Sequence, residues 1–161
     1  MDNGLAHLRI LVAEDESLIA LDLETILNQL GCEVIGPVAE VEDIARMAES
    51  QHIDGALVDV NLRGKQVFGV LPLLISRGIP VVLTSGYDDP TLFPEAYRQL
   101  PRVTKPFDLK AIYKVCRQTM VLCKESELIY ARSVSTPGNG KDSSQRKPSL
   151  ANFKSTEPPK S

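Results

Sequence analysis

Four short apolar runs in this chain each end in a polar residue that could carry chemistry. Those end positions hold Glu14 with Asp15, then Asp59, Thr84 and Lys105. Short runs that are apolar throughout are typical of parallel strands buried on both faces. In an open parallel sheet, ligands bind outside the carboxyl ends of the strands. The sequence therefore predicts that carboxylates, a hydroxyl and an ammonium group meet at one edge of a sheet.

Strand and helix patterns alternate from residue 8 to about residue 125. Strands are predicted over residues 8–13, 33–38, 56–60, 79–83 and 102–104, with a loop at 61–65. Helices are predicted over residues 17–30, 41–50, 71–77 and 94–100, and from Asp108, a plausible N-cap, past Leu122. Right-handed connections of this length give a parallel sheet with helices on both faces. We therefore predict an α/β fold built from repeated strand–helix units.

The chain of 161 residues is long enough for one domain with its own core but short for two. We assign residues 1–7 to an N-terminal extension and residues 8–125 to the domain. Residues 126–161 are assigned to the end of the last helix and a basic tail rich in Ser, Pro and Lys. The tail has few apolar residues, so it is predicted to be disordered.

Charge is unevenly distributed along the chain. Residues 131–161 hold six Lys or Arg and two Asp or Glu, whereas the whole chain has a net charge of −3, so residues 1–130 carry −7. An acidic domain argues against nucleic-acid binding by the domain itself. No apolar stretch approaches the ~20 residues of a membrane span. With no secretory leader and three cysteines that lack metal-ligand spacing, we expect a cytoplasmic protein.

The acidic residues Glu14 and Asp15 would lie beside Asp59, because the first and third strands are neighbours at the switch point of such a sheet. A solvated acidic loop is the simpler interpretation. Several carboxylates at one place repel one another, however, unless a cation lies between them. Mg²⁺ takes carboxylate oxygens and waters as ligands and leaves room for phosphate. One carboxylate could then act as a nucleophile and form an aspartyl phosphate.

Thr84 and Lys105 say little when taken alone, but both are placed at strand ends. Pro106 restricts Lys105 to extended conformations, which would fix the lysine near the carboxylates. There it can pair with them, or with a phosphoryl oxygen when phosphate arrives. Because the lysine would make no buried apolar contact, replacing it with alanine is expected to leave thermal stability unchanged or raise it.

Four segments in this order resemble the receiver domain of two-component response regulators. The segments are Ile10 to Glu16, Leu57 to Val60, Pro80 to Tyr87 and Val103 to Phe107. The resemblance covers residues 8 to about 122 and is to the stand-alone, single-domain type. It implies a flavodoxin-like, five-stranded parallel sheet of order 2-1-3-4-5.

The resemblance also implies a role for each residue of the site. Asp59 would be the phosphoacceptor, and Thr84 and Lys105 would sense the phosphate. Mg²⁺ would be bound by Glu14, Asp15, Asp59 and the backbone carbonyl of Asn61. The phosphoryl group would come from a histidine kinase or a histidine phosphotransfer protein. The chain would not be an enzyme, and it would signal through protein–protein contacts to a downstream protein or act as a phosphate sink.

One position departs from the family pattern. Many receivers have an aromatic residue three positions before the lysine, as a partner of the threonine, and here that residue is Arg102. We therefore expect phosphorylation to act mainly through the loop from Thr84 to Tyr87 and a short fourth helix. Arg102 would be a surface group that contacts a partner or an acidic side chain, or simply a solvated edge residue.

Two other functions compete with the phosphoacceptor. One is a receiver-like binding module that is never phosphorylated, although the presence of every expected site residue argues against it. The other is a metal-dependent phosphohydrolase, because the run from Asp59 to Asn61 faintly resembles the Asp-x-Asp signature of haloacid dehalogenase-like enzymes. The second aspartate is missing and the motif follows the third strand rather than the first, which argues against that activity.

Overall fold

The structure, a computed structural model, describes residues 4–87, 89–122 and 125. Its central sheet consists of β1 (Arg9–Ala13), β2 (Glu33–Val38), β3 (Gly55–Asp59), β6 (Val81–Ser85) and β7 (Arg102–Thr104). All pairings in this sheet are parallel, in the order β2-β1-β3-β6-β7. The short strands β4 (Asn61–Leu62) and β5 (Lys65–Gln66) form a separate antiparallel hairpin. The five-stranded parallel sheet of order 2-1-3-4-5 is thereby confirmed.

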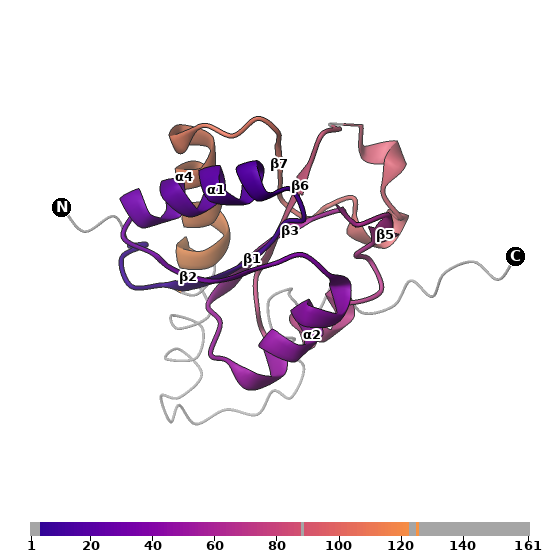
Figure 1. The fold of residues 1–161 in the computed structure, drawn as a ribbon, viewed down its shortest axis with the longest axis horizontal. Coiled ribbons are helices and arrows are strands. Elements are labelled where there is room, and N and C mark those ends of the chain that lie inside the picture. Colours follow the sequence, from indigo (N-terminus) through magenta and orange to yellow (C-terminus); the bar gives the residue numbers. More distant parts are fainter. Residues whose placement is uncertain (1–3, 88, 123–124, 126–161) are drawn as a thin grey trace, which may run out of the picture.

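Helices cover both faces of the sheet. Figure 1 shows α1 (Ser17–Gln29) and α4 (Leu109–Cys116) together on one side and α2 (Val41–Ser50) on the other. The short helix α3 (Leu71–Ser76) packs with α2. Alternate residues of β1 therefore enter different cores: Ile10 lies in the α1 and α4 core, and Leu11 lies in the α2 and α3 core. The continuous apolar runs in the sequence therefore correctly indicated a sheet that is buried on both faces.

The predicted fourth helix is the clearest error in the predicted elements. Within the described residues between β6 and β7, the chain makes two 3₁₀ turns, Pro90–Leu92 and Glu95–Tyr97, instead of an α-helix over residues 94–100. Asp89 caps the first turn, because its side chain accepts a hydrogen bond from the Thr91 N–H at 2.9 Å. Prolines favour the first turn of a helix and interrupt its interior, so closely spaced prolines keep each turn short.

The segment predicted as a loop after β3 is instead the β4–β5 hairpin. Its tip residues, Arg63 and Gly64, have φ angles of 49° and 80°. A two-residue turn with both central residues in the left-handed region matches the twist of the flanking strands. Leu62 is buried in the α2 and α3 core and fixes the hairpin to the domain.

The segment before β1 packs into the domain. Leu5, in the segment assigned to an extension, is fully buried in the α1 and α4 core, and the His7 N–H donates to the Gly31 carbonyl at 2.8 Å. Asp108 is the N-cap of α4, as predicted, and accepts a hydrogen bond from the Ala111 N–H at 2.7 Å.

After α4 the chain continues as a π-helical segment, Arg117–Leu122. Its Met120 is fully buried, and its side chain would meet a Cβ placed on Gly55, so a larger residue at the start of β3 would require Met120 to move. The predicted end of the last helix and the predicted disordered tail, together residues 126–161, lie outside the described residues. None of the described helices combines the length and the apolar composition that crossing a membrane requires.

Candidate functional site

Strand register brings the predicted site residues to one end of the sheet. Ala13, which precedes Glu14, pairs with Val58, which precedes Asp59. Asp59 itself pairs with Thr84 on the next strand. Lys105 directly follows the last strand, β7, and its N–H donates to the Ser85 carbonyl of β6 at 2.9 Å. This hydrogen bond places the lysine at the same end of the sheet. Four strand ends therefore meet as the sequence predicted, and Glu14, Asp59 and Thr84 are all buried.

Lys105 forms two ion pairs at the centre of this group. Its Nζ lies 2.7 Å from Asp59 Oδ2 and 2.7 Å from Glu14 Oε2, and its side chain is 15% exposed. Burial disfavours the ammonium form, but the hydrogen bonds to Asp59 and Glu14 outweigh it and raise the pKa of Lys105. The lysine is therefore a fixed cation between two carboxylates.

Three carboxylates surround the same point. Glu14, Asp15 and Asp59 each offer a carboxylate oxygen, and these oxygens lie within 4.8 Å of one another. Burial, together with the nearby charge of Asp59, raises the pKa of Glu14 although Lys105 opposes the change. Burial also acts against ionisation of Asp15, but the Arg63 N–H hydrogen bond and other local contacts outweigh it and lower that pKa. These oxygen donors suit a hard divalent cation such as Mg²⁺.

Backbone amides orient each of the three carboxylates. Glu14 Oε1 accepts from the Glu16 N–H at 3.0 Å, and Asp59 Oδ1 accepts from the Asn61 N–H at 3.1 Å. Asp15 Oδ2 accepts from the Arg63 N–H at 3.0 Å. The Asn61 backbone therefore lies beside Asp59, and the role of its carbonyl as a metal ligand stays a prediction. The Arg63 contact was not predicted, because nothing local in the sequence places the hairpin tip over the loop after β1.

The strand end at β6 holds two buried hydroxyls, whereas only Thr84 was predicted there. The neighbouring Ser85 hydroxyl accepts a hydrogen bond from the Tyr87 N–H at 2.9 Å, and its carbonyl accepts from Lys105. Ser85 thus connects the lysine to the start of the β6–β7 connection. Its position directly before Gly86, at the end of an apolar run, was the signal that could have found it.

Arg102 is not a solvated edge residue. Its guanidinium carbon lies 5.1 Å from the centre of the Phe93 ring, within the range of a cation–π contact. Its Nη1 also donates to the Arg98 carbonyl at 3.2 Å. Phe93 is buried and meets Phe68 edge to face at 6.1 Å between ring centres, and Phe68 stacks on Tyr97 at 5.8 Å. Arg102 therefore holds the β6–β7 connection against β7.

Comparison with known proteins finds relatives that are regulatory proteins. No family model matches the chain. The regulator PhyR of Methylorubrum extorquens is 31% identical over 114 residues, which are 69% of this chain and 43% of that protein. The chain spans about half the length, or less, of the curated relatives it matches.

Solved structures show the same relationship. The solution structure of SdrG from Sphingomonas melonis has a TM-score of 0.61 and 35% identity, covering 68% of this chain and 92% of SdrG. The response regulator PhyR from Brucella abortus has a TM-score of 0.72 and 25% identity, covering 81% of this chain and 55% of PhyR. With its sheet order, its cluster of strand-end residues and these relatives, the chain belongs to the receiver-domain family of two-component response regulators.

Proposed function

We propose that this domain accepts a phosphoryl group on Asp59 from a histidine kinase or a histidine phosphotransfer protein. The observation that carries the proposal is the geometry around Lys105, whose Nζ lies 2.7 Å from both Asp59 and Glu14. A buried nucleophilic carboxylate is thus held next to a cation and next to further acidic groups. This arrangement suits a site that exchanges one anionic partner of the lysine for another.

The transfer needs no group beyond the two proteins and the bound cation. An oxygen of Asp59 forms a bond to phosphorus as the bond from phosphorus to the donor's imidazole nitrogen breaks. The electron pair of the broken bond stays on the imidazole. The product is an aspartyl phosphate, a covalent intermediate that carboxylates are known to form. The domain is the acceptor in this step, and we expect no turnover of free substrates of the kind that an enzyme would show.

Residues around Asp59 would bind the cation needed for the transfer and would respond to the phosphoryl group once it is attached. Glu14, Asp15, Asp59 and the Asn61 carbonyl would hold Mg²⁺, which would offset the negative charge of the phosphoryl oxygens when bound. Lys105 would leave the carboxylates and pair with a phosphoryl oxygen. Thr84, in register with Asp59, would bring its hydroxyl toward the same group. A movement of the Lys105 or Thr84 side chain would alter the end of β6, and through it the connection between β6 and β7.

The surface beside the site suits a protein donor. Leu18 and Leu21 on α1 are 82% and 59% exposed, and α1 begins just after Asp15. Leu109, the first residue of α4, is also exposed, and α1 and α4 pack against each other on one face of the sheet (Figure 1). A donor that delivers phosphate to Asp59 must contact the protein around this edge. We therefore assign the exposed leucines of α1 to the contact with the phosphodonor.

Phosphate would act through protein–protein contacts with a downstream protein, or the domain would serve as a phosphate sink. The test is mass spectrometry after incubation with acetyl phosphate and Mg²⁺, followed by transfer from a phosphorylated histidine donor. The wild-type protein should gain one phosphoryl group, on Asp59. A wild-type protein that stays unlabelled by both donors, while folded, would favour a binding module that is never phosphorylated.

A further inference from the structure

The tip of the β4–β5 hairpin lies next to the acidic site. The hairpin begins two residues after Asp59, and the backbone N–H of Arg63 at its tip donates to Asp15 Oδ2. Glu14 and Asp59 are both held by ion pairs to Lys105. Asp15 has no such ion pair to Lys105; its carboxylate is hydrogen-bonded to this amide, to its own backbone N–H and to the Glu14 side chain. Of these contacts only the Arg63 amide comes from outside the loop after β1, so the position of the hairpin tip affects how one predicted metal ligand is oriented.

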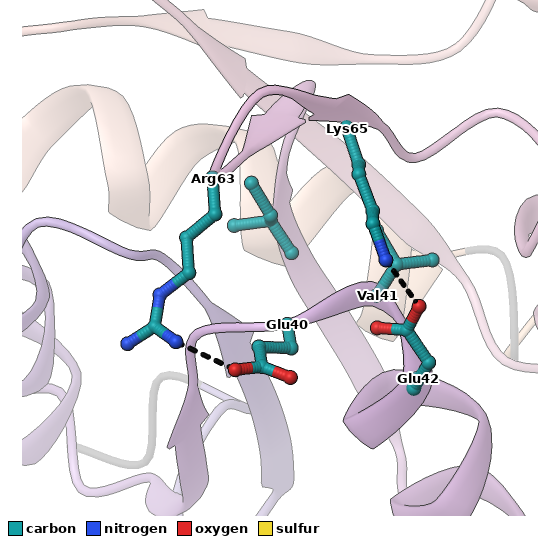
Figure 2. Close-up of a pocket in the computed structure, with 6 residues that line it drawn as sticks. Glu40, Val41, Glu42, Arg63 and Lys65 are labelled. Atoms are coloured by element: carbon teal, nitrogen blue, oxygen red, sulfur yellow. Dashed lines mark hydrogen bonds and ion pairs between the residues drawn. The ribbon is translucent and has the colours of Figure 1, made fainter.

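Two ion pairs connect the hairpin to the start of α2. Figure 2 shows the Arg63 guanidinium directed at Glu40 and the Lys65 ammonium directed at Glu42. These residues and the buried Leu62 line a small hollow. The four charged side chains are each about half exposed or more, so their contribution to overall stability is small. Their effect is on the position of the hairpin rather than on stability.

The backbone of Arg63 supports the same conclusion. Its φ of 49° is in the left-handed region, where Asn or Gly is favoured and most side chains are strained. Arginine is therefore an unfavourable choice for the turn itself. The ion pair with Glu40 gives a reason for its presence, because the side chain ties the turn to a third segment of the chain.

We propose that Arg63 is a positioning residue of the Mg²⁺ site and that its ion pair with Glu40 fixes the amide that holds Asp15. The inference rests on the proposed function, because it assumes that Asp15 is a ligand of the cation. Neither Arg63 nor Glu40 would touch the cation. Each acts through the Asp15 carboxylate, as the hydrogen-bonding partners of metal ligands do in other sites.

The test compares two matched variants, Glu40→Gln and Glu42→Gln, by calorimetric titration of the unphosphorylated protein with Mg²⁺. Both remove one negative charge and one ion pair to the hairpin, but only Glu40 contacts the residue whose amide reaches Asp15. Glu40→Gln should weaken Mg²⁺ binding about three- to tenfold, and Glu42→Gln less than about twofold. The Arg63 amide should also exchange with solvent faster in Glu40→Gln in the absence of metal.

A second variant separates the ion pair from the turn. Arg63→Asn keeps a residue that tolerates the left-handed region but removes the guanidinium, and its Mg²⁺ affinity should fall as in Glu40→Gln. The double variant should bind Mg²⁺ no more weakly than the weaker single variant, because both remove the same interaction. Equal affinities for Glu40→Gln and Glu42→Gln, whether unchanged or lowered together, would overturn the inference. A wild-type protein that binds no Mg²⁺ would overturn the proposed function itself.

Discussion

Two regions of the molecule differ in the interactions that hold them in place. One is the carboxyl ends of β1 and β3, and the other is the connection between β6 and β7. At the first region, strand register and two ion pairs to Lys105 fix the carboxylates. At the second, prolines, an Asp89 cap and contacts between aromatic rings hold two short turns, with Tyr87 and Leu92 exposed. The first region depends on the backbone of the sheet. The second depends on contacts between side chains, and we expect this segment to report a change at the site.

The largest effect is expected from Asp59→Asn, which removes the nucleophile. Labelling by acetyl phosphate should be lost completely, because no other described carboxylate lies in register with Thr84 and pairs with Lys105. The fold should persist, since the amide keeps an oxygen that can accept from the Asn61 N–H. Mass spectrometry checks the first point and circular dichroism the second. Labelling of the variant at the wild-type level would remove Asp59 from its assigned role.

Replacing Lys105 tests whether the carboxylate region is held by charge. From the sequence alone we expected Lys105→Ala to leave stability unchanged or raise it, but the two ion pairs are a reason to expect a loss of stability. Lys105→Met would leave two buried carboxylates side by side without their cation, so it should destabilise metal-free protein by about 1–3 kcal/mol. Added Mg²⁺ should restore part of the loss. Denaturation in chelator and in Mg²⁺ measures both, and equal stability of variant and wild type in chelator would restore the original expectation.

The donor contact can be separated from the chemistry. Leu18→Gln should slow transfer from a phosphorylated histidine protein by roughly tenfold, as loss of a central apolar contact costs more than about 1 kcal/mol. Labelling by acetyl phosphate should not change, because Leu18 is exposed and belongs to neither core. Leu122→Gln, at an exposed leucine beyond the far end of α4, is the matched control. Equal rates for the two variants would argue against α1 as the contact surface.

The residues of the site could be predicted from the sequence more completely than the contacts that surround them. Continuous apolar runs fix which residues end each parallel strand, and parallel strands end at the same edge, so Glu14, Asp59 and Lys105 could be placed together from sequence alone. Ser85 was missed because Thr84 beside it fits the pattern of a strand-end hydroxyl equally well. The Arg63–Glu40 pair and the Arg102–Phe93 contact could not be predicted, since they join segments that are far apart or irregular.

Ser85 and Thr84 offer a direct comparison at the boundary between the two regions. Both alanine variants should accept phosphate, because neither hydroxyl is the nucleophile. Thr84→Ala should reduce the chemical-shift changes that phosphorylation causes, whereas Ser85→Ala should loosen residues 86–87 even without phosphate, since the Tyr87 N–H loses its acceptor. NMR spectra with and without phosphate distinguish the two. If only Ser85→Ala abolished the phosphate response, the sensing role assigned to Thr84 would pass to Ser85.

The smallest effect is expected from Arg102, and it tests the second region most directly. Arg102→Ala removes the cation from the face of Phe93, a contact that contributes about 0.5–1 kcal/mol. Labelling of Asp59 should stay unchanged, but amide signals across residues 89–97 should broaden or shift, and the phosphate response there should weaken. Arg102→Lys is the control, because it keeps the charge without the planar group. If phosphorylation changed the signals of β7 but not those of residues 84–97, the connection between β6 and β7 would not be the part that reports phosphorylation.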